Sequence, residues 1–211
     1  MARNADTPAY LATLTTGFDF THHIRTLCVD VVSRMPEMSH IQMDRVAISF
    51  CQTRKRVRNG VWASLTPMRF ANGRLTEMRN GREYTVQRLF DENGQEMLYI
   101  LAFYLPRFLQ LDFQSKLDTL FHELWHISPQ FNGDIRRFSG RCFAHSHSEK
   151  EYDASVNELA KRWLVRDPPP ELYTFLKMSH GRLRQKYGHV FGSKIPQPKL
   201  LPLPDDDSSR G

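Results

Sequence analysis

Two histidines and a glutamate stand at a spacing that can build a metal-dependent hydrolytic site. The run His122-Glu123-Leu124-Trp125-His126 places two imidazoles four residues apart, and residues four apart lie on one face of an α-helix. Both rings can therefore bind one ion. Glu123 can reach a water on that ion and act as its general base, because zinc lowers the pKa of its bound water towards ~7. This H-E-x-x-H pattern is typical of zinc peptidases.

The residues around the motif favour a metal site over a chance match. Asp112 can cap a helix that ends near Ser128, because Pro129 disfavours helical geometry at the residue before it. The apolar side chains of this helix form one stripe that would anchor it in the core, leaving His122 and His126 on its flank. A chance match would instead leave two ordinary surface or hydrogen-bonded histidines. The stripe consists of Phe113, Leu117, Leu120, Phe121 and Leu124.

A catalytic zinc also needs a third protein ligand, with one position open for water. His145 and His147 are two residues apart and would share one face of an extended segment. They precede a possible capping box, Ser148 with Glu151. Glu158, on the helix that this box would begin, is the best carboxylate candidate. The residues alone leave His145, His147 and a carboxylate such as Glu158 open as the third ligand.

Upstream of the motif, the sequence predicts one helix followed by an antiparallel sheet. Residues 19–35 have the apolar spacing of a helix that ends before Pro36. Four Asn-Gly pairs follow, and each can form a tight hairpin turn. They separate five segments that can be strands, which predicts an antiparallel β-meander. These segments are residues 45–58, 61–70, 74–79, 82–90 and 95–105.

Downstream of the motif, the sequence predicts further helices and then a tail. One helix should run from the capping box to about Val165, and another over residues 171–187, after a run of three prolines. From Gly192 onward Pro, Ser and Asp predominate, which is typical of a disordered segment. We therefore expect one α+β domain over residues 1–191 and a disordered tail over residues 192–211.

Composition restricts the cellular context and the partners. The chain has 211 residues and a formal net charge of +6, which allows contact with DNA or another acidic surface. A basic cluster, residues 54–58, is either such a contact or the solvated tip of a hairpin. The N-terminus lacks the apolar run of a secretory leader, and the longest apolar run is about half a membrane span. We expect a soluble, cytoplasmic protein with no membrane partner.

The cysteines do not indicate a further site. Cys28, Cys51 and Cys142 are scattered, and no pair has C-x-x-C spacing. A disulfide framework and a thiolate zinc site are therefore disfavoured, and we expect three free thiols.

Residues 121–138, which read FHELWHISPQFNGDIRRF, resemble the metallopeptidases found in phages and bacteria. Those are similar in outline to the SprT-like zinc peptidases, and the resemblance extends from the first helix to about Val165. It implies a zincin-like α+β fold, in which an antiparallel meander packs against the motif helix, and a Zn²⁺ cofactor. The third ligand would then be His145 or His147. Many SprT-like proteins add a cysteine-rich zinc ribbon, which this chain lacks.

The resemblance implies hydrolysis of protein or peptide substrates in a bacterial or phage-infected cell. In zincins a sheet edge beside the motif helix often aligns the peptide, and Met97–Leu105 is our candidate for this strand; its alternative is a buried core strand. Tyr99, Tyr104, Tyr152 or Arg141 could stabilise the oxyanion. Two rival functions stay open: a DNA-associated protease, and a non-catalytic binding protein that metal merely stabilises.

Overall fold

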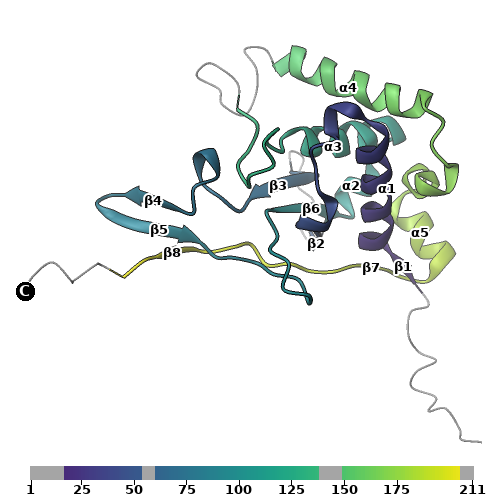
Figure 1. The fold of residues 1–211 in the computed structure, drawn as a ribbon. Helices are drawn as coiled ribbons and strands as arrows, with labels where there is room; N and C mark the ends of the chain where they lie inside the picture. Colours follow the sequence, from purple (N-terminus) through teal and green to yellow (C-terminus); the bar gives the residue numbers. More distant parts are fainter. Residues whose placement is uncertain (1–16, 54–59, 138–148, 205–211) are drawn as a thin grey trace, which may run out of the picture.

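The computed structural model describes residues 17–53, 60–137 and 149–204, with side chains from residue 156 onward in the last range (Figure 1). His145, His147, Cys142 and the basic cluster 54–58 lie outside the described residues. The helices are α1 (Phe20–Arg34), α2 (Arg107–Gln110), α3 (Phe113–Trp125), α4 (Glu149–Val165) and α5 (His180–Tyr187). The strands are β1 (Phe18–Asp19), β2 (Val46–Gln52), β3 (Ala63–Pro67), β4 (Thr76–Arg79), β5 (Arg82–Val86), β6 (Tyr99–Leu105), β7 (Val190–Phe191) and β8 (Leu200–Pro202).

The central sheet has the order β2-β6-β3. β6 pairs antiparallel with β3 but parallel with β2. The predicted antiparallel meander is therefore wrong for β2, which does not pair with β3. All but one of the β6 residues are buried, and burial on both faces is typical of a strand with a partner on each side. The most apolar strand thus occupies the centre, although it comes last of the three in the sequence.

The two faces of the central sheet bury different cores, because successive side chains of a strand point to opposite faces. Tyr99, Leu101 and Phe103 of β6 belong to the large core beneath the helices, whereas Ile100 belongs to a small cluster on the other face. α1 contacts β2, α3 contacts β3, and α4 lies along α3 (Figure 1). The helices therefore gather on one face of the sheet.

The first helix and one hairpin follow their sequence signals closely. Asp19 caps α1 by accepting a hydrogen bond from the His22 N–H at 3.0 Å. Asn80 and Gly81 join β4 to β5 with φ angles of 51° and 77°, as a tight hairpin turn requires. Both predictions are confirmed. The predicted helix over residues 171–187 is instead broken into two 3₁₀ turns, Pro170–Leu172 and Thr174–Lys177, and α5.

The C-terminal segment differs from its prediction as a disordered tail. Residues 190–204 form an extended strap that pairs with β1 through β7 and with β5 through β8. Between these strands, the Ser193 carbonyl accepts from the Phe50 N–H at 2.7 Å, on the outer edge of β2. The strap thus covers one edge of the central sheet. β4, β5 and β8 form a separate sheet that extends away from the helices (Figure 1).

Two further expectations concern thiols and membranes. Cys28 is a buried free thiol and Cys51 is a half-buried one. Among the described helices, none is both long enough and apolar enough to cross a bilayer.

Candidate metal centre and cleft

The helix that carries the motif is fixed at its start and along one face. Asp112 caps α3, accepting from the Ser115 N–H at 2.8 Å and from the Ser115 hydroxyl at 2.7 Å. Leu117, Leu120 and Leu124 are completely buried, so the predicted apolar stripe anchors the helix. The helix ends at Trp125, three residues before the predicted end. The local prediction of a capped, amphipathic helix is confirmed.

The two motif histidines converge at the C-terminal end of α3. Their Nε2 atoms are 3.0 Å apart, and both side chains are half-buried. Two imidazole nitrogens bound to one tetrahedral zinc ion at ~2.05 Å would lie about 3.3 Å apart. His122 and His126 are therefore placed to hold a metal ion with almost no movement of the helix.

The third ligand is not found among the residues that the structure describes. Within those ranges no group of three His, Cys, Asp or Glu side chains could hold a metal ion. Glu158, the carboxylate candidate, is exposed on α4 and does not join the histidine pair. His145 and His147 lie in the undescribed range, so the choice between them stays a prediction.

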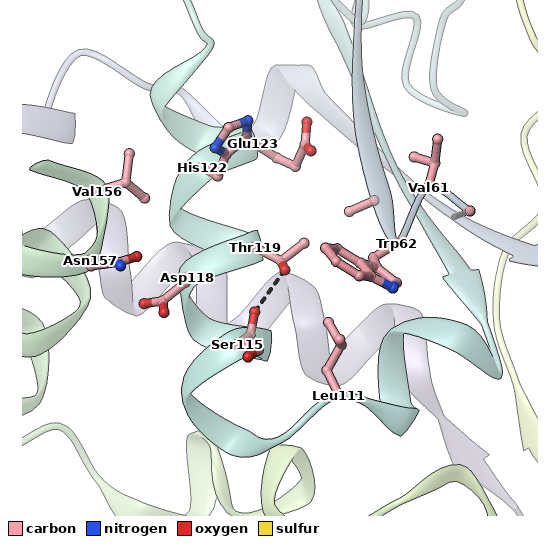
Figure 2. A pocket seen from close by; sticks show the side chains of 12 residues that line it. Val61, Trp62, Leu111, Ser115, Asp118, Thr119, His122, Glu123, Val156 and Asn157 are labelled. Atoms are coloured by element: carbon pink, nitrogen blue, oxygen red, sulfur yellow. Dashed lines mark hydrogen bonds between the residues drawn. The ribbon is translucent and has the colours of Figure 1, made fainter. Parts of the chain in front are cut away.

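Glu123 lies beside the histidine pair in a poorly hydrated position. Its side chain is 9% exposed, and burial raises the pKa of the carboxyl group from 4.5 to about 7. A hydrogen bond from the backbone of Leu65 in β3 acts in the opposite direction. The carboxyl group thus faces the edge of the central sheet (Figure 2) and has a pKa suited to proton transfer near neutral pH.

A cleft of about 550 Å³ borders this group. Figure 2 shows it along the exposed side of α3, between the start of β3 on one side and α4 on the other. A cavity of this size and mostly apolar lining is typical of a ligand site. The lining residues are Gly60, Val61, Trp62, Ala63, Leu111, Ser115, Asp118, Thr119, His122, Glu123, Val156 and Asn157.

β3, rather than β6, is the sheet edge next to this cleft. The Trp62 carbonyl accepts from the Tyr104 N–H of β6, and the Met68 N–H donates to the Leu98 carbonyl just before β6. The alternating positions Trp62, Ser64 and Thr66 therefore direct their backbone groups inward, towards β6. Ala63 and Leu65 therefore direct theirs to the outer edge, beside α3. The prediction that Met97–Leu105 forms the substrate edge is wrong, since β6 lies between two strands.

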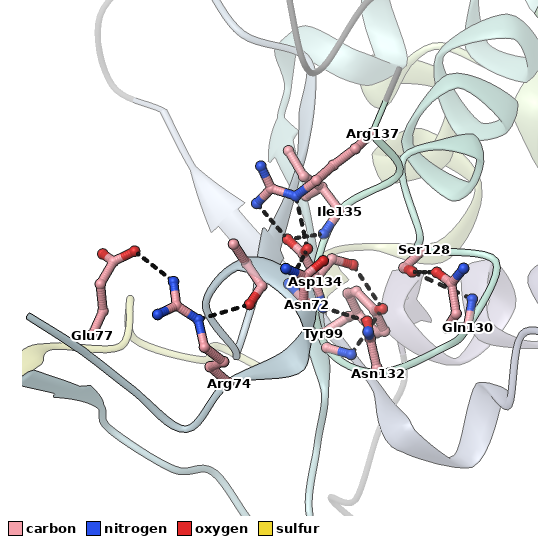
Figure 3. A network of polar contacts seen from close by, with 12 residues as sticks. Asn72, Arg74, Glu77, Tyr99, Ser128, Gln130, Asn132, Asp134, Ile135 and Arg137 are labelled. Atoms are coloured by element: carbon pink, nitrogen blue, oxygen red, sulfur yellow. Dashed lines mark hydrogen bonds and ion pairs between the residues drawn. The ribbon is translucent and has the colours of Figure 1, made fainter. Parts of the chain in front are cut away.

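The segment after α3 is held by a polar network (Figure 3). The buried Tyr99 hydroxyl donates to the Asp134 carbonyl at 2.9 Å and accepts from the Gly133 N–H at 3.0 Å. The Asp134 carboxylate accepts hydrogen bonds from the Asn72 N–H and from Nε and Nη2 of Arg137. Burial raises the pKa of Tyr99 to about 12. Tyr99 thus supports this segment and is not placed as an oxyanion donor.

Arg136 ties the same segment to the end of α3. Its Nε donates to the Trp125 carbonyl at 2.8 Å, and its guanidinium lies 3.9 Å from the centre of the Trp125 ring. Its backbone N–H donates to the His126 carbonyl at 2.7 Å. This support was not predicted from the sequence, and neither were Trp62 and Asp118 in the cleft. Only Asp118 left a signal, because it precedes His122 by four residues.

The family comparison covers the elements that build this site. A model of the family described as "Putative phage metallopeptidase" matches residues 21–161, from α1 through the histidine motif into α4. The chain belongs to this family. The metallopeptidase resemblance seen in the sequence is thereby confirmed, and membership indicates a hydrolase that uses a metal cofactor. Comparisons with curated proteins and with solved structures found no match.

Proposed function

We propose that this metallopeptidase is a zinc-dependent enzyme that hydrolyses peptide bonds. The observation that carries the proposal is the convergence of the His122 and His126 Nε2 atoms beside the buried carboxyl group of Glu123, at the border of a cleft. The pair would supply two ligands, and His145 or His147 the third. A zinc ion bound there would polarise the scissile carbonyl.

Glu123 is assigned the proton transfers. It takes a proton from the attacking water and returns it to the leaving amine, as a general base and then a general acid. Its burial supports this role, because a carboxyl group with an ordinary pKa would hold a proton too weakly to donate it near pH 7. Leu65, whose backbone donates to the carboxyl group, orients it between the helix and the strand edge.

The outer edge of β3 is our candidate for aligning the substrate. Ala63 and Leu65 direct backbone groups towards the cleft side of the strand. An extended peptide can add to such an edge through main-chain hydrogen bonds, which give affinity without selecting a sequence. This alignment would bring the scissile bond next to Glu123 and the histidine pair.

The test measures metal content and peptide hydrolysis in parallel. We expect about one zinc per wild-type chain, lost in His126→Ala and in either His145→Ala or His147→Ala. Glu123→Gln should retain zinc and lose hydrolysis by about 10²- to 10⁴-fold. Glu171→Gln, which removes an exposed carboxylate from the turn after α4, is the matched control.

Two outcomes would refute the proposal. Full activity in Glu123→Gln would exclude the assigned base. Absence of zinc from the reconstituted wild type would leave the motif as a coincidence of helical spacing and would favour a non-catalytic binding protein.

A further inference from the structure

The sheet formed by β4, β5 and β8 has two outer edges that differ in their main-chain groups. β5 lies between β4 and β8, and the three strands project away from the helices (Figure 1). An outer strand can offer unpaired N–H and C=O groups to another strand, and proteins usually block such an edge. The outward-facing residues of β4 and β8 therefore decide whether a further strand can join this sheet.

The edge at β8 is blocked by proline. The Leu203 N–H donates to the Glu83 carbonyl at 2.8 Å, so Leu203 directs its backbone groups towards β5. Successive residues of an antiparallel strand alternate in this direction, and Pro202 therefore directs its backbone to the outer side. Proline has no N–H to donate and is typical of protected edges. A second strand could not form a complete hydrogen-bond ladder with β8.

The edge at β4 carries no such block. Asn80 and Gly81 form the two-residue turn, so the flanking residues Arg79 and Arg82 exchange main-chain hydrogen bonds. Met78 then directs its N–H and C=O groups away from β5, and it is 62% exposed. Among the strands that the structure describes, β4 pairs with β5 alone. Another strand can therefore pair with β4 at Met78.

The charges on either side of Met78 are complementary to themselves. Glu77 precedes Met78 and Arg79 follows it. In an antiparallel pair of two β4 strands centred on Met78, Glu77 of each copy lies directly opposite Arg79 of the other, which is favourable. A pair centred on Glu77 or on Arg79 would place like charges opposite each other. The register centred on Met78 therefore fits both the main chain and the charges.

Both charged side chains reach solvent. The Glu77 side chain is 26% exposed and that of Arg79 is 51% exposed, and the Arg79 Nε donates to the Glu77 carboxylate at 2.8 Å. Arg79 also lies opposite Arg82 across the hairpin, and like charges in this position are unfavourable. Glu77 of a second copy would add a carboxylate beside Arg79, so that four charges of alternating sign surround the two-fold axis.

We propose that the outer edge of β4 is an interaction surface for a second copy of this chain. The two β4 strands pair antiparallel about a two-fold axis at Met78, and the two sheets become one continuous antiparallel sheet. The Met78 N–H of each copy donates to the Met78 carbonyl of the other, and Glu77 of each copy pairs with Arg79 of the other. The surface contains none of the residues that line the cleft beside α3, so the dimer leaves that cleft open.

The first experiment measures the mass of the wild-type chain by sedimentation equilibrium. One short strand from each copy makes a small interface, so we expect a dissociation constant on the order of 100 µM. Between about 10 µM and about 1 mM the weight-average mass should rise from near one chain towards two. Met78→Pro removes the outward donor but leaves the bonds to β5 in place. This variant should associate about tenfold more weakly or worse.

Exchanging the two charges tests the register. Glu77→Arg and Arg79→Glu each place like charges opposite each other, twice in a two-fold dimer, and each should weaken self-association by about tenfold or more. The double variant restores opposite pairs and should associate within about threefold of the wild type. An equimolar mixture of the two single variants should form a mixed dimer, because each supplies the charge that the other lacks. Glu92→Arg, the same change in an exposed turn, is the matched control and should associate like the wild type.

The outcomes support or overturn the dimer without reference to catalysis. Recovery of association in the double variant and in the mixture supports pairing of β4 with a second copy in this register. A single-chain mass for the wild type up to about 1 mM overturns the proposal. So does a dimer whose dissociation constant is unchanged in Met78→Pro and in both single charge variants. Circular dichroism verifies that each variant is folded, and Met78→Pro decides the question if a charge variant is not.

Discussion

The two ends of α3 both bury a charged side chain, but they treat it differently. At the N-terminal end, Lys116 is 2% exposed, and its ammonium group donates to the carbonyls of Leu176 and Met178 at 2.8 and 3.0 Å. At the C-terminal end, Glu123 is 9% exposed and accepts from one backbone group, and burial raises its pKa to about 7. Burial disfavours the charged form of both groups and lowers the pKa of Lys116, but the Lys116 ammonium group has two backbone acceptors, whereas one backbone donor acts on the Glu123 carboxyl group.

This contrast separates polar burial that serves stability from polar burial that serves chemistry. A buried charge with its hydrogen bonds complete locks two elements together, whereas a poorly compensated one adds to the free energy of the folded state. Such local violations are expected at functional sites. Substitutions at the two ends of α3 should therefore differ in sign as well as in size.

The largest effect should come from Lys116→Met, which keeps the aliphatic stem and removes the ammonium group. The carbonyls of Leu176 and Met178 then lose a buried donor, so we expect a loss of about 3 kcal/mol in the free energy of unfolding. Urea denaturation measures it. Lys161→Met, at an exposed position of α4, should change stability by less than about 0.5 kcal/mol. Similar losses in both variants would contradict the structural role of Lys116.

A smaller loss is expected from Tyr99→Phe, which tests the support behind the C-terminal end. The substitution removes the hydroxyl that bonds to Asp134 and Gly133 and should cost about 1–2 kcal/mol. The matched control is Tyr104→Phe, whose half-buried hydroxyl lies 3.4 Å from the Ser64 hydroxyl. The melting temperature of Tyr99→Phe should be well below that of the control. Equal melting temperatures would show that the polar network contributes little.

Glu123→Gln should have the opposite sign and stabilise the metal-free protein. The neutral amide avoids the desolvation cost of the buried carboxylate, so we expect a gain of about 1 kcal/mol at pH 8. Chelator-treated wild type and variant are compared by urea denaturation. A loss of stability as large as that of Lys116→Met would show that the Glu123 carboxyl group stabilises the fold as the Lys116 ammonium group does. That result would contradict the proposed difference between the two ends of α3.

The smallest effect concerns the cap of α3 and its pH dependence. Hydrogen bonds from the N–H and hydroxyl of Ser115 lower the pKa of Asp112 below its usual 3.8. A lowered carboxyl pKa stabilises the fold above the unfolded-state pKa, and this contribution is lost as the pH falls. Asp112→Ala should therefore lower the melting temperature at pH 7, with the difference shrinking towards pH 3. Asp112→Asn removes the same titrating group but keeps an uncharged cap, so its difference from the wild type should change with pH by the same amount and be smaller than that of Asp112→Ala at pH 7.

The local features of α3 could be predicted from the sequence because short-range rules determine them. A cap acts over three residues, an apolar stripe repeats every three or four, and a histidine pair at four residues shares a face. The same applies to the Asn80-Gly81 turn, whose φ angles depend on those two residues. These interactions need no knowledge of distant parts of the chain.

The pairing of the strands could not be predicted in the same way. β2 and β3 are neighbours in sequence, but β6 lies between them, because its side chains are apolar on both faces and are buried only with a partner on each side. The polar C-terminal strap is joined to β2 and β5 by main-chain hydrogen bonds. The composition of this segment predicted disorder. Composition reflects side chains only, so it carries no information about main-chain hydrogen bonds to a sheet edge.

Local residue spacing was sufficient to predict the helix that carries the histidine motif, its cap, its buried face and the convergence of His122 and His126 at its end. Three features depend on the folded chain: the strand edge that faces Glu123, the desolvation of that carboxyl group, and the cleft that Trp62 and Asp118 both border. Edges, desolvation and clefts arise where segments far apart in the chain meet. They depend on which surfaces stay outside the core once the chain has folded, and no local pattern of residues specifies those surfaces.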